Sequence, residues 1–383
     1  MNSLLSGYKT LMAQSSALAP LAIERVMRVK GDVRLGVPVV LTTKGQSALV
    51  VAIEMLTPDR FDALTAAGRR ADIALTRHRM AGLGLADLPA AEVWGMALPV
   101  DATLHWVNAL ADPAISVVAT VTDRKGAPLT APFAGDTICK AAIALAKSAQ
   151  LLPAALVVPL DGNLTEALQH GLCMIDAGEV LAELAAERFQ HHVSTARLPM
   201  AHHHSGRVHV FRPDDGSVEH YAIEIGAPDL TRPVLVRLHS ACFTGDVMGS
   251  LKCDCGAQLN AACAAMAEAG GGVLLYLNQE GRGIGMANKM RAYALQDTGF
   301  DTVEANNHLG FDDDERDFRN GSALLRQLGI ATVRLMTNNP AKVAILQAQG
   351  ITVTERVPLQ VGKTTVNARY LATKAAKSGH VLA

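Results

Sequence analysis

Three of the six cysteines lie close enough in the sequence to bind one metal ion. Cys242, Cys253 and Cys255 fall within HSACFTGDVMGSLKCDCG, where turn-forming residues separate the first thiol from the other two. Three thiolates can converge on one Zn²⁺ at about 2.3 Å each, and a tetrahedral ion then keeps one position for water, as in catalytic zinc sites. A closed structural site, with His239 as fourth ligand, is the alternative. Cys-x-Cys pairs are less common in structural sites than Cys-x2-Cys pairs, which favours the catalytic form, and Cys263 is expected to be a core residue.

A glycine-rich segment is the second candidate element. Residues 278–285 read NQEGRGIG and stand between an apolar run and a helical pattern. Backbone N–H groups in such a strand-to-helix loop can bind an anion at the start of the helix, although many such loops are only tight turns. Glu280 and Arg282 favour binding, because a carboxylate accepts hydrogen bonds from the N–H groups of a guanine and an arginine suits a phosphate.

A second helix start with room for a phosphate is expected at residues 337–342, which read TNNPAK. Asn339 is a good N-cap and Pro340 fits the first helical position. The free N–H groups, together with Thr337 and Lys342, would suit a phosphate. Simple helix capping without a ligand is an equally good interpretation.

The acidic segment at residues 312–317, DDDERD, has five acids in six residues. Such a run usually forms a solvated loop. In a site with phosphates and a metal it would supply a general base, and Arg316 would neutralise a phosphoryl group. The three histidines at 202–204 have no acid or cysteine beside them, which favours a surface linker over a metal site.

The elements that must position these segments alternate along the second half of the chain. Strands are expected at 234–238, 272–277, 332–336 and 351–356, and helices at 258–269, 286–297, 322–328 and 340–349. In the first half, strands are expected at 37–41, 115–121 and 155–160, and helices at 58–67 and 137–150. The composition changes at 190–213, which is rich in His, Ser, Gly and Pro. The sequence therefore predicts an α+β (mixed α/β) protein with two domains, residues 1–193 and 194–383, each a mixed sheet with packed helices.

Charge and hydropathy exclude several classes of protein. Lys and Arg total 35 against 36 Asp and Glu, whereas binding to a nucleic-acid polymer needs a surplus of cations on one face. No apolar run approaches the roughly 18–20 residues of a membrane-spanning helix, and the N-terminus lacks the pattern of a secretory signal. We expect a cytoplasmic protein with neither nucleic acid nor a membrane as partner.

Four segments together resemble GTP cyclohydrolase II, the zinc enzyme that opens guanine to begin riboflavin synthesis: RLHSACFTGDVMGSLKCDCG, YLNQEGRGIGMANKMRAYALQDTGFDTVEAN, LGFDDDERDF and LMTNNPAKV. The resemblance runs from about Ala196 to the C-terminus. It implies hydrolysis of GTP to 2,5-diamino-6-(5-phosphoribosylamino)pyrimidin-4(3H)-one, with release of formate and pyrophosphate. It also implies a homodimer, Mg²⁺ bound with the triphosphate, and one Zn²⁺ per chain held by Cys242, Cys253 and Cys255 in the open form of the site.

The resemblance implies roles for further residues. Asp314 corresponds to a proton acceptor and Arg316 to a nucleophile toward the α-phosphate. Because arginine has almost no neutral form at pH 7, a charge-stabilising role suits Arg316 better than a covalent one. Tyr293 corresponds to a residue of the ring-opening site. The GTP-binding positions are Arg237, Leu238, His239, Ser240, Ala241, Gln258, Glu280, Gly281, Arg282, Thr302, Thr337 and Lys342.

Two positions depart from the family's usual pattern. Where the family usually reads HSEC, this chain reads HSAC, with Ala241 in place of the acid. Where the family usually reads YLRQEGR, this chain reads YLNQEGR, with Asn278 in place of the arginine. The loss of charge near the nucleotide could change affinity or substrate. The alternatives are a catalytically silent GTP-binding regulator, a relative that acts on another purine or in pyrimidine breakdown, and a bifunctional riboflavin enzyme.

The first half resembles 3,4-dihydroxy-2-butanone 4-phosphate synthase, to which this cyclohydrolase is often fused. Residues 36–41, the TPDRFDAL stretch and residues 141–160 follow the outline of that domain. That enzyme needs an acid-rich loop after its first strand to bind Mg²⁺ and move protons, whereas residues 42–48 read TTKGQSA, without a carboxylate. Gly135-Asp136-Thr137 stands where a catalytic histidine is expected. The sequence thus predicts an inactive domain kept for folding, dimerisation or regulation.

Overall fold

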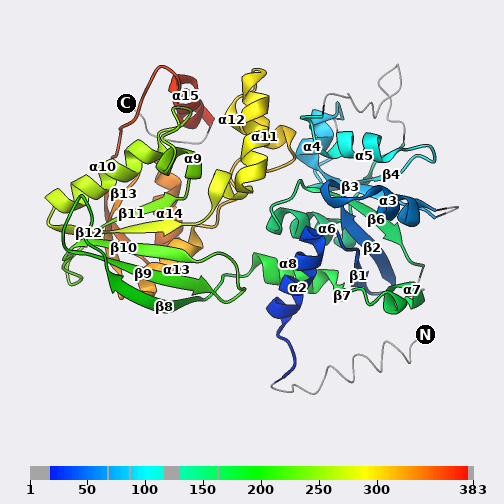
Figure 1. Ribbon diagram of the computed structural model, residues 1–383, viewed down its shortest axis with the longest axis horizontal. Helices are drawn as coiled ribbons and strands as arrows, with labels where there is room; N and C mark the ends of the chain where they lie inside the picture. Colours follow the sequence, from blue (N-terminus) through cyan, green and yellow to red (C-terminus); the bar gives the residue numbers. More distant parts are fainter. Residues whose placement is uncertain (1–17, 67–68, 86–87, 116–129, 162–163, 378–383) are drawn as a thin grey trace.

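The computed structural model describes residues 18–66, 69–85, 88–115, 130–161 and 164–377. These residues form two seven-stranded sheets, one from each half of the chain, at opposite ends of the long axis (Figure 1). Both sheets contain parallel and antiparallel neighbours, which confirms the predicted α+β (mixed α/β) class. Within the described ranges, no helix is long and apolar enough to span a membrane.

The first sheet has the strand order β5-β4-β3-β6-β2-β1-β7. Its central strands are buried on both faces, so their sequences are continuous apolar runs without alternation. Most neighbours are antiparallel, and only the pair β1 and β7 among the described strands is parallel. The strands are β1 (Val39–Thr43), β2 (Gln46–Ala52), β3 (Asp72–Thr76), β4 (Val93–Ala97), β5 (Phe133–Ala134), β6 (Ala154–Pro159) and β7 (Met174–Asp176).

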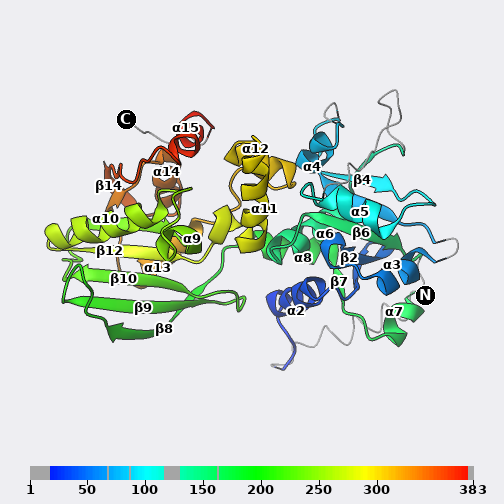
Figure 2. The ribbon, with the colours of Figure 1, turned by 45° about the horizontal axis from the view of Figure 1, so that its top comes forward.

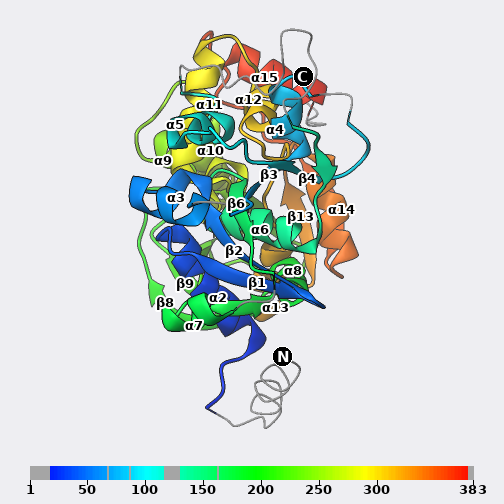
Figure 3. The same cartoon turned by 90° about the vertical axis from the view of Figure 1, so that its right-hand side faces the viewer.

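Helices cover both faces of the first sheet. On one face α6 contacts β1, β2, β3, β4 and β6, with α2 and α8 beside it (Figure 3). The helices begin where side chains cap them: Thr57, Thr76, Thr103 and Asp136 each accept a hydrogen bond from the N–H three residues on. The elements are α2 (Ala22–Arg34), η1 (Ile53–Met55), α3 (Pro58–Thr65), α4 (Arg77–Gly82), α5 (Leu104–Ala111), α6 (Thr137–Ser148), α7 (Thr165–Gln169) and α8 (Ala177–Ala185).

The second sheet has the order β14-β13-β11-β12-β10-β9-β8. The strands from β12 to β8 are antiparallel neighbours, whereas β12, β11, β13 and β14 are parallel, so the carboxyl ends of these four meet at one edge. The glycine-rich segment and the TNNPAK segment follow β12 and β13, and the first thiol follows β11. The strands are β8 (Gln190–Arg197), β9 (Gly206–Pro213), β10 (His220–Gly226), β11 (Val234–Ser240), β12 (Gly271–Leu277), β13 (Thr332–Met336) and β14 (Thr352–Val357).

The helices of the second half are of two kinds. α10 packs on one face of the sheet, and α13 and α14 pack on the other. α11 and α12 lie between the two sheets (Figures 1 and 2), and their apolar residues join a core of the first half. The two halves therefore share one core. The elements are α9 (Phe243–Asp246), α10 (Cys255–Glu268), η2 (Glu280–Gly283), α11 (Gly285–Asp297), α12 (Thr302–His308), α13 (Arg319–Gln327), α14 (Pro340–Ala348) and α15 (Ala368–Lys377).

Some segments differ from the expectations. Residues 190–213 contain β8 and β9, which their composition does not indicate, and the second sheet thus begins at Gln190, four residues before the expected start of the second domain. The three histidines lie between these strands. Residues 42–48, which the sequence suggests as a loop after the first strand, belong instead to the β1–β2 hairpin, whose turn at 44–45 has Gly45 at a φ of +88°. The expected strand at 115–121 lies outside the described residues, apart from Ile115.

Candidate active site

A cavity of about 310 Å³ lies at the carboxyl edge of the second sheet, where parallel sheets usually bind ligands. Its wall contains every site residue expected from the sequence except Thr337. Thr337 is buried, and its Oγ1 accepts a hydrogen bond from the N–H of Asn339 at 3.0 Å, which stabilises the turn before α14. The fold therefore brings together segments that are up to about a hundred residues apart in the chain.

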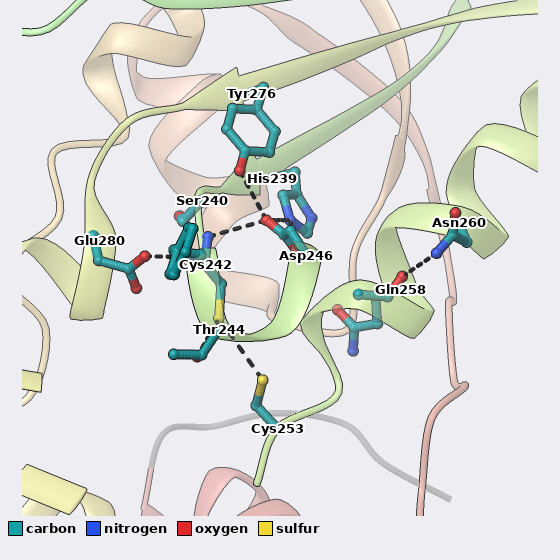
Figure 4. Close-up of polar contacts among 12 residues, drawn as sticks. His239, Ser240, Cys242, Thr244, Asp246, Cys253, Gln258, Asn260, Tyr276 and Glu280 are labelled. Carbon is teal, nitrogen blue, oxygen red and sulfur yellow. Dashed lines mark hydrogen bonds and ion pairs between the residues drawn. The ribbon is translucent and has the colours of Figure 1, made fainter. Parts of the chain in front are cut away.

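The three candidate zinc ligands converge in the wall of this cavity. Cys242 follows β11 and Cys253 lies just before α10 (Figure 4). Cys255 is the first residue of α10. The Sγ atoms of Cys242 and Cys253 are 3.7 Å apart, and all three Sγ atoms lie within 4.8 Å of one another. Two thiolates bound to one tetrahedral zinc would be about 3.8 Å apart, so this spacing fits the ion. His239, the alternative fourth ligand, is not a member of the group.

The turn between the thiols leaves no space for a side chain at Gly245. A Cβ atom there would lie 2.8 Å from Sγ of Cys253 and 3.1 Å from Sγ of Cys242. Hydrogen bonds with the other two thiols, followed by the ammonium group of Lys289, hold the pKa of Cys242 far below its ordinary value. The site therefore favours the thiolate, which is the form that binds a metal.

Asp246, which the sequence patterns did not single out, fixes the backbone beside the first thiol (Figure 4). Its carboxylate, whose side chain is 3% exposed, accepts hydrogen bonds from the N–H of Cys242 and the hydroxyl of Tyr276, both at 3.0 Å. Nε2 of His239 lies 3.0 Å from the same carboxylate. Burial lowers the pKa of His239, so the neutral ring donates here. The sequence does contain one indication of this role: Asp246 is an acid four residues after a candidate metal ligand, and metal ligands need orienting partners.

Lys289 is the second functional residue that the sequence did not reveal. Its Nζ lies 3.1 Å from Sγ of Cys242 and 2.9 Å from Oγ1 of Thr244, and it donates to Oε1 of Glu280 at 2.8 Å. Oε2 of Glu280 accepts the N–H of Phe243 at 2.6 Å. Glu280 and Lys289 thus connect the glycine-rich turn and α11 to the thiol turn. A lysine inside a helix, with no motif around it, gives no local signal of this contact.

The glycine-rich turn has a left-handed backbone along most of its length. Gly281, Gly283 and Gly285 have φ values of +64°, +95° and +85°, and Arg282 between them has +61°. Three of these positions suit glycine, whereas Arg282 is strained, which is typical of functional turns. Its Nη1 donates to the carbonyl of Asp313 at 3.0 Å, so the strained residue connects the turn to the acidic segment.

Asp314 and Arg316 form a two-pronged ion pair in the cavity wall. Nε and Nη2 of Arg316 donate to the two carboxylate oxygens of Asp314 at 2.7 and 2.5 Å, and Nη1 donates to Oγ of Ser240 at 3.3 Å. Burial by itself would raise the pKa of Asp314, but the hydrogen bonds and charge of Arg316 outweigh it, and the pKa lies below its ordinary value. Asp314 is therefore ionised and able to accept a proton.

Further cations and polar groups complete the wall. Arg237 is buried, and although burial lowers its pKa to about 10 it stays charged; its Nη2 donates to Gln258 at 2.5 Å. Lys342 lies 4.6 Å from the ring centroid of Phe318. Burial raises the pKa of Tyr293 to about 12, so its hydroxyl keeps its proton. Thr302 begins α12 at the cavity edge.

The two departures from the usual family pattern differ in where they lie. Asn278 is not part of the cavity wall; its side chain donates to the carbonyl of Glu219 at 2.5 Å, and its N–H donates to Nδ1 of His220 at 3.1 Å. Ala241 lines the cavity, and its N–H donates to the carbonyl of Leu277 at 2.8 Å. Ala241 is thus the departure that changes the cavity wall.

A sequence model of the GTP cyclohydrolase II family matches residues 190–358. GTP cyclohydrolase-2 of Azotobacter vinelandii is 57% identical over 175 residues, which are 46% of this chain and 84% of that protein. A solved two-domain 3,4-dihydroxy-2-butanone 4-phosphate synthase from A. baumannii matches 82% of this chain and 93% of that one, with 16% identity and a TM-score of 0.34, too weak a likeness to support any conclusion. GTP cyclohydrolase-2 of Azospirillum brasilense is 42% identical over 367 residues, which are 94% of each chain. With a relative this similar along nearly its whole length, the chain belongs to the GTP cyclohydrolase II family.

Proposed function

We propose that this protein hydrolyses GTP to 2,5-diamino-6-(5-phosphoribosylamino)pyrimidin-4(3H)-one, with release of formate and pyrophosphate, as the first step of riboflavin biosynthesis. The observation that carries the proposal is one cavity whose wall contains three thiols at zinc spacing, the ionised Asp314 and several cations. The named relatives support it, because they are GTP cyclohydrolases.

The thiols of Cys242, Cys253 and Cys255 would hold one Zn²⁺ in this proposal. When bound, the ion supplies a water activated for attack on C8 of guanine. Asp246 keeps the backbone of Cys242 in place. Glu280 would accept hydrogen bonds from the N–H groups of guanine, in place of one of its present contacts with Phe243 and Lys289.

Asp314 would accept a proton during opening of the imidazole ring. Arg316 would control when the carboxylate of Asp314 is available for this. In this structure the guanidinium of Arg316 occupies both oxygens of Asp314. A triphosphate would compete for that guanidinium and so free the carboxylate. Arg316 then stabilises charge on the α-phosphate, which suits a group that remains protonated.

The triphosphate would be neutralised by placed cations and by Mg²⁺. Arg237 and Lys342 stand in the wall with Arg316. Among the residues that the structure describes, the cysteine group is the only cluster of three potential metal ligands. Mg²⁺ would enter with the triphosphate and supply part of the positive charge that neutralises it.

Formate release tests the proposal. Protein with one zinc per chain, incubated with GTP and Mg²⁺, should release formate and pyrophosphate in equal amounts. Asp314→Asn is the matched control, because it should keep its zinc and lose turnover. No formate from the zinc-loaded protein would overturn the proposed activity.

Ala241 favours a second candidate, a GTP-binding regulator without turnover. This residue lines the cavity where the family usually has an acid, so a charge of the usual site is missing. Submicromolar GTP binding by calorimetry, without formate release, would support this candidate. Turnover gained by Ala241→Glu would identify the missing acid as the cause.

For the first half, residues 1–193, we propose a degenerate 3,4-dihydroxy-2-butanone 4-phosphate synthase domain without its own catalysis. Residues 42–48 form part of a tight hairpin without a carboxylate, so they offer no ligand for Mg²⁺. Incubation with ribulose 5-phosphate and Mg²⁺ should yield no four-carbon product. Formation of that product would instead support a bifunctional riboflavin enzyme.

We also propose a homodimer, as the resemblance to the family implies. Sedimentation velocity should give twice the mass of one chain, and a monomer at micromolar concentration would contradict this.

A further inference from the structure

The acidic segment that carries Asp314 and Arg316 is held by side chains of the first half of the chain. Nζ of Lys147, in the last turn of α6, donates to Oδ2 of Asp312 at 2.9 Å and to Oε1 of Glu315 at 2.7 Å. Nε2 of His78, on α4, lies 3.2 Å from Oδ1 of Asp312. These contacts join residues 165 or more positions apart in the sequence.

Lys147 is well placed to act as a cation. Its side chain is 21% exposed and that of Glu315 is 20% exposed, so water weakens their attraction less than it would on an open surface. Burial lowers the pKa of Lys147, but the two carboxylates outweigh burial and raise it overall. The end of a helix also favours a positive charge.

Glu315, which contacts Lys147, also binds the backbone before Asp314 and the backbone of the glycine-rich turn. Its Oε1 also accepts the N–H of Asp312 at 2.9 Å, and its own N–H donates to the carbonyl of Arg282 at 3.0 Å. A Cβ atom at Gly283 would lie 2.7 Å from the carbonyl oxygen of Glu315. The segment is therefore held between Lys147 and the glycine-rich turn.

Residues of the acidic segment line two different spaces. Asp314 and Arg316 line the active-site cavity. Glu315 and Asp317 line a separate cleft of about 730 Å³, to which Lys147 also belongs. A change at Lys147 therefore acts on the reverse side of the segment, without contact with the cavity.

The residues that follow α6 contact the end of the glycine-rich turn, where α11 begins. The carbonyl of Gln150 accepts a hydrogen bond from Nδ2 of Asn288 at 3.0 Å, and the side chain of Gln150 packs against Gly285. The end of α6 thus contacts both the acidic segment and the beginning of α11.

We infer that Lys147 is a positioning residue for the reaction of the other half: through Glu315 and Asp312 it holds Asp314 and Arg316 toward the cavity. This inference rests on the proposed function, because Asp314 and Arg316 are assigned to that reaction. It gives the first half a physical role, which is to keep the catalytic segment in its working conformation.

Steady-state formate release from the full chain tests the inference. Lys147→Met should lower kcat about 10- to 100-fold, the range expected when a catalytic group is misplaced by about 1 Å, with a smaller change in KM for GTP. Lys147→Arg should restore most of the kcat, because it keeps the charge. Lys140→Met is the matched control, since Lys140 lies exposed on the same helix and should behave as wild type.

Equal kcat values for Lys147→Met and Lys140→Met would overturn the inference. A lower zinc content or a lower Tm in Lys147→Met that Lys147→Arg does not restore would also overturn the inference. Such a result would show that Lys147 has a merely structural role. Glu315→Gln should add little to the effect of Lys147→Met, since the two changes disrupt one interaction.

Hydrogen–deuterium exchange separates this inference from the proposed function. In the substrate-free full chain, Lys147→Met should speed exchange at residues 312–317 and leave β13 unchanged. If the wild type releases no formate, the proposed function fails, while faster exchange would still support the positioning role. Unchanged exchange would overturn the positioning role whatever the activity.

Discussion

At the scale of single residues, Gly245 shows how closely the backbone approaches the three thiols. A Cβ atom there would be 2.8 Å from Sγ of Cys253, below the distance that real contacts allow. Gly245→Ala should therefore move the thiols apart and weaken zinc binding by about 10-fold or more. Competition with a chromogenic chelator measures this affinity, and excess zinc should restore part of the activity.

Gly31→Ala is the control for this change. Gly31 lies within α2, where a Cβ atom would meet nothing within 4 Å, so its replacement should leave zinc binding intact. Equal zinc affinities for the two variants would show that the thiol turn can relax around a methyl group.

The carboxylate of Asp246 is predicted to support zinc binding by orienting the backbone of Cys242. Oδ2 of Asp246 accepts hydrogen bonds from both the N–H of Cys242 and the hydroxyl of Tyr276, while Nε2 of His239 lies 3.1 Å from Oδ1. An asparagine at this position keeps the shape but has one acceptor oxygen, so its NH₂ group would face one of these donors. Asp246→Asn should lower zinc affinity about 10- to 100-fold. Tyr276→Phe, which removes one of these donors, should have a smaller effect; the reverse order of the two affinities would refute an orienting role for Asp246.

At the scale of elements, strand β10 supports the start of the glycine-rich turn through a neutral histidine. Nδ1 of His220 accepts the N–H of Asn278 at 3.1 Å, and burial lowers the pKa of His220 from 6.5 to about 4. The unfolded chain therefore binds a proton at higher pH than the folded one. Stabilisation by the neutral ring is complete above pH 6.5 and is lost as the pH falls toward 4, about 3 kcal/mol in total.

Thermal unfolding at pH 7.5 and pH 5.0 measures this contribution. The Tm of His220→Gln should decrease less than that of the wild type between these two pH values, because the variant has no imidazole at this position to protonate. The exposed His105 supplies the control variant His105→Gln, which should follow the wild type. An equal loss of Tm in all three proteins would assign the acid sensitivity to other groups.

Four strands and four helices of the second half could be predicted from the sequence, because local signals define them, whereas β8, β9 and β10 were not predicted. Asn339 and Pro340 start α14, and the strand predicted at 332–336 is the observed β13. β8 was missed because it is exposed along nearly its whole length, so no apolar alternation is visible in it. Its place depends on pairing with β9, which a local pattern does not contain.

The residues of the candidate site also divide into those that a local sequence pattern indicates and those that only the folded structure reveals. The cysteine cluster and the glycine-rich turn are short segments, so their spacing indicates their chemistry. Lys289 and Lys147 have no motif around them, since they reach the site only after α11 and α6 are packed. Contacts between distant helices decide such roles, and a single sequence carries no record of those contacts.

At the scale of the whole molecule, α11 is the element through which the two halves meet. Its Lys289 reaches the thiols, while its Arg291 donates to Asp112 at 2.9 Å and to Glu54 at 3.0 Å in the first half. Ala292 and Leu295 of the same helix belong to the core of the first half. The position of the cavity wall is therefore coupled to the packing of the first half.

Arg79 makes this coupling testable in the free energy of unfolding. It is buried, and its guanidinium donates to the carbonyls of Leu110 at 2.7 Å and Ala109 at 3.1 Å in the first half and to that of His308 at 3.0 Å in the second. Arg79→Met would leave three carbonyls without this donor, at a cost of about 3 kcal/mol. Differential scanning calorimetry should then show a Tm lower by roughly 4 °C.

The neighbouring Arg77 is exposed, so Arg77→Met removes the same charge without opening the interface. Because α12 follows the glycine-rich turn and α11, Arg79→Met should also lower kcat at temperatures where the protein is still folded, whereas Arg77→Met should not. A Tm and a kcat that match those of Arg77→Met would show that the two halves fold and work independently. A lower Tm together with a lower kcat would show that the reaction proposed for the second half depends on contacts made by the first half.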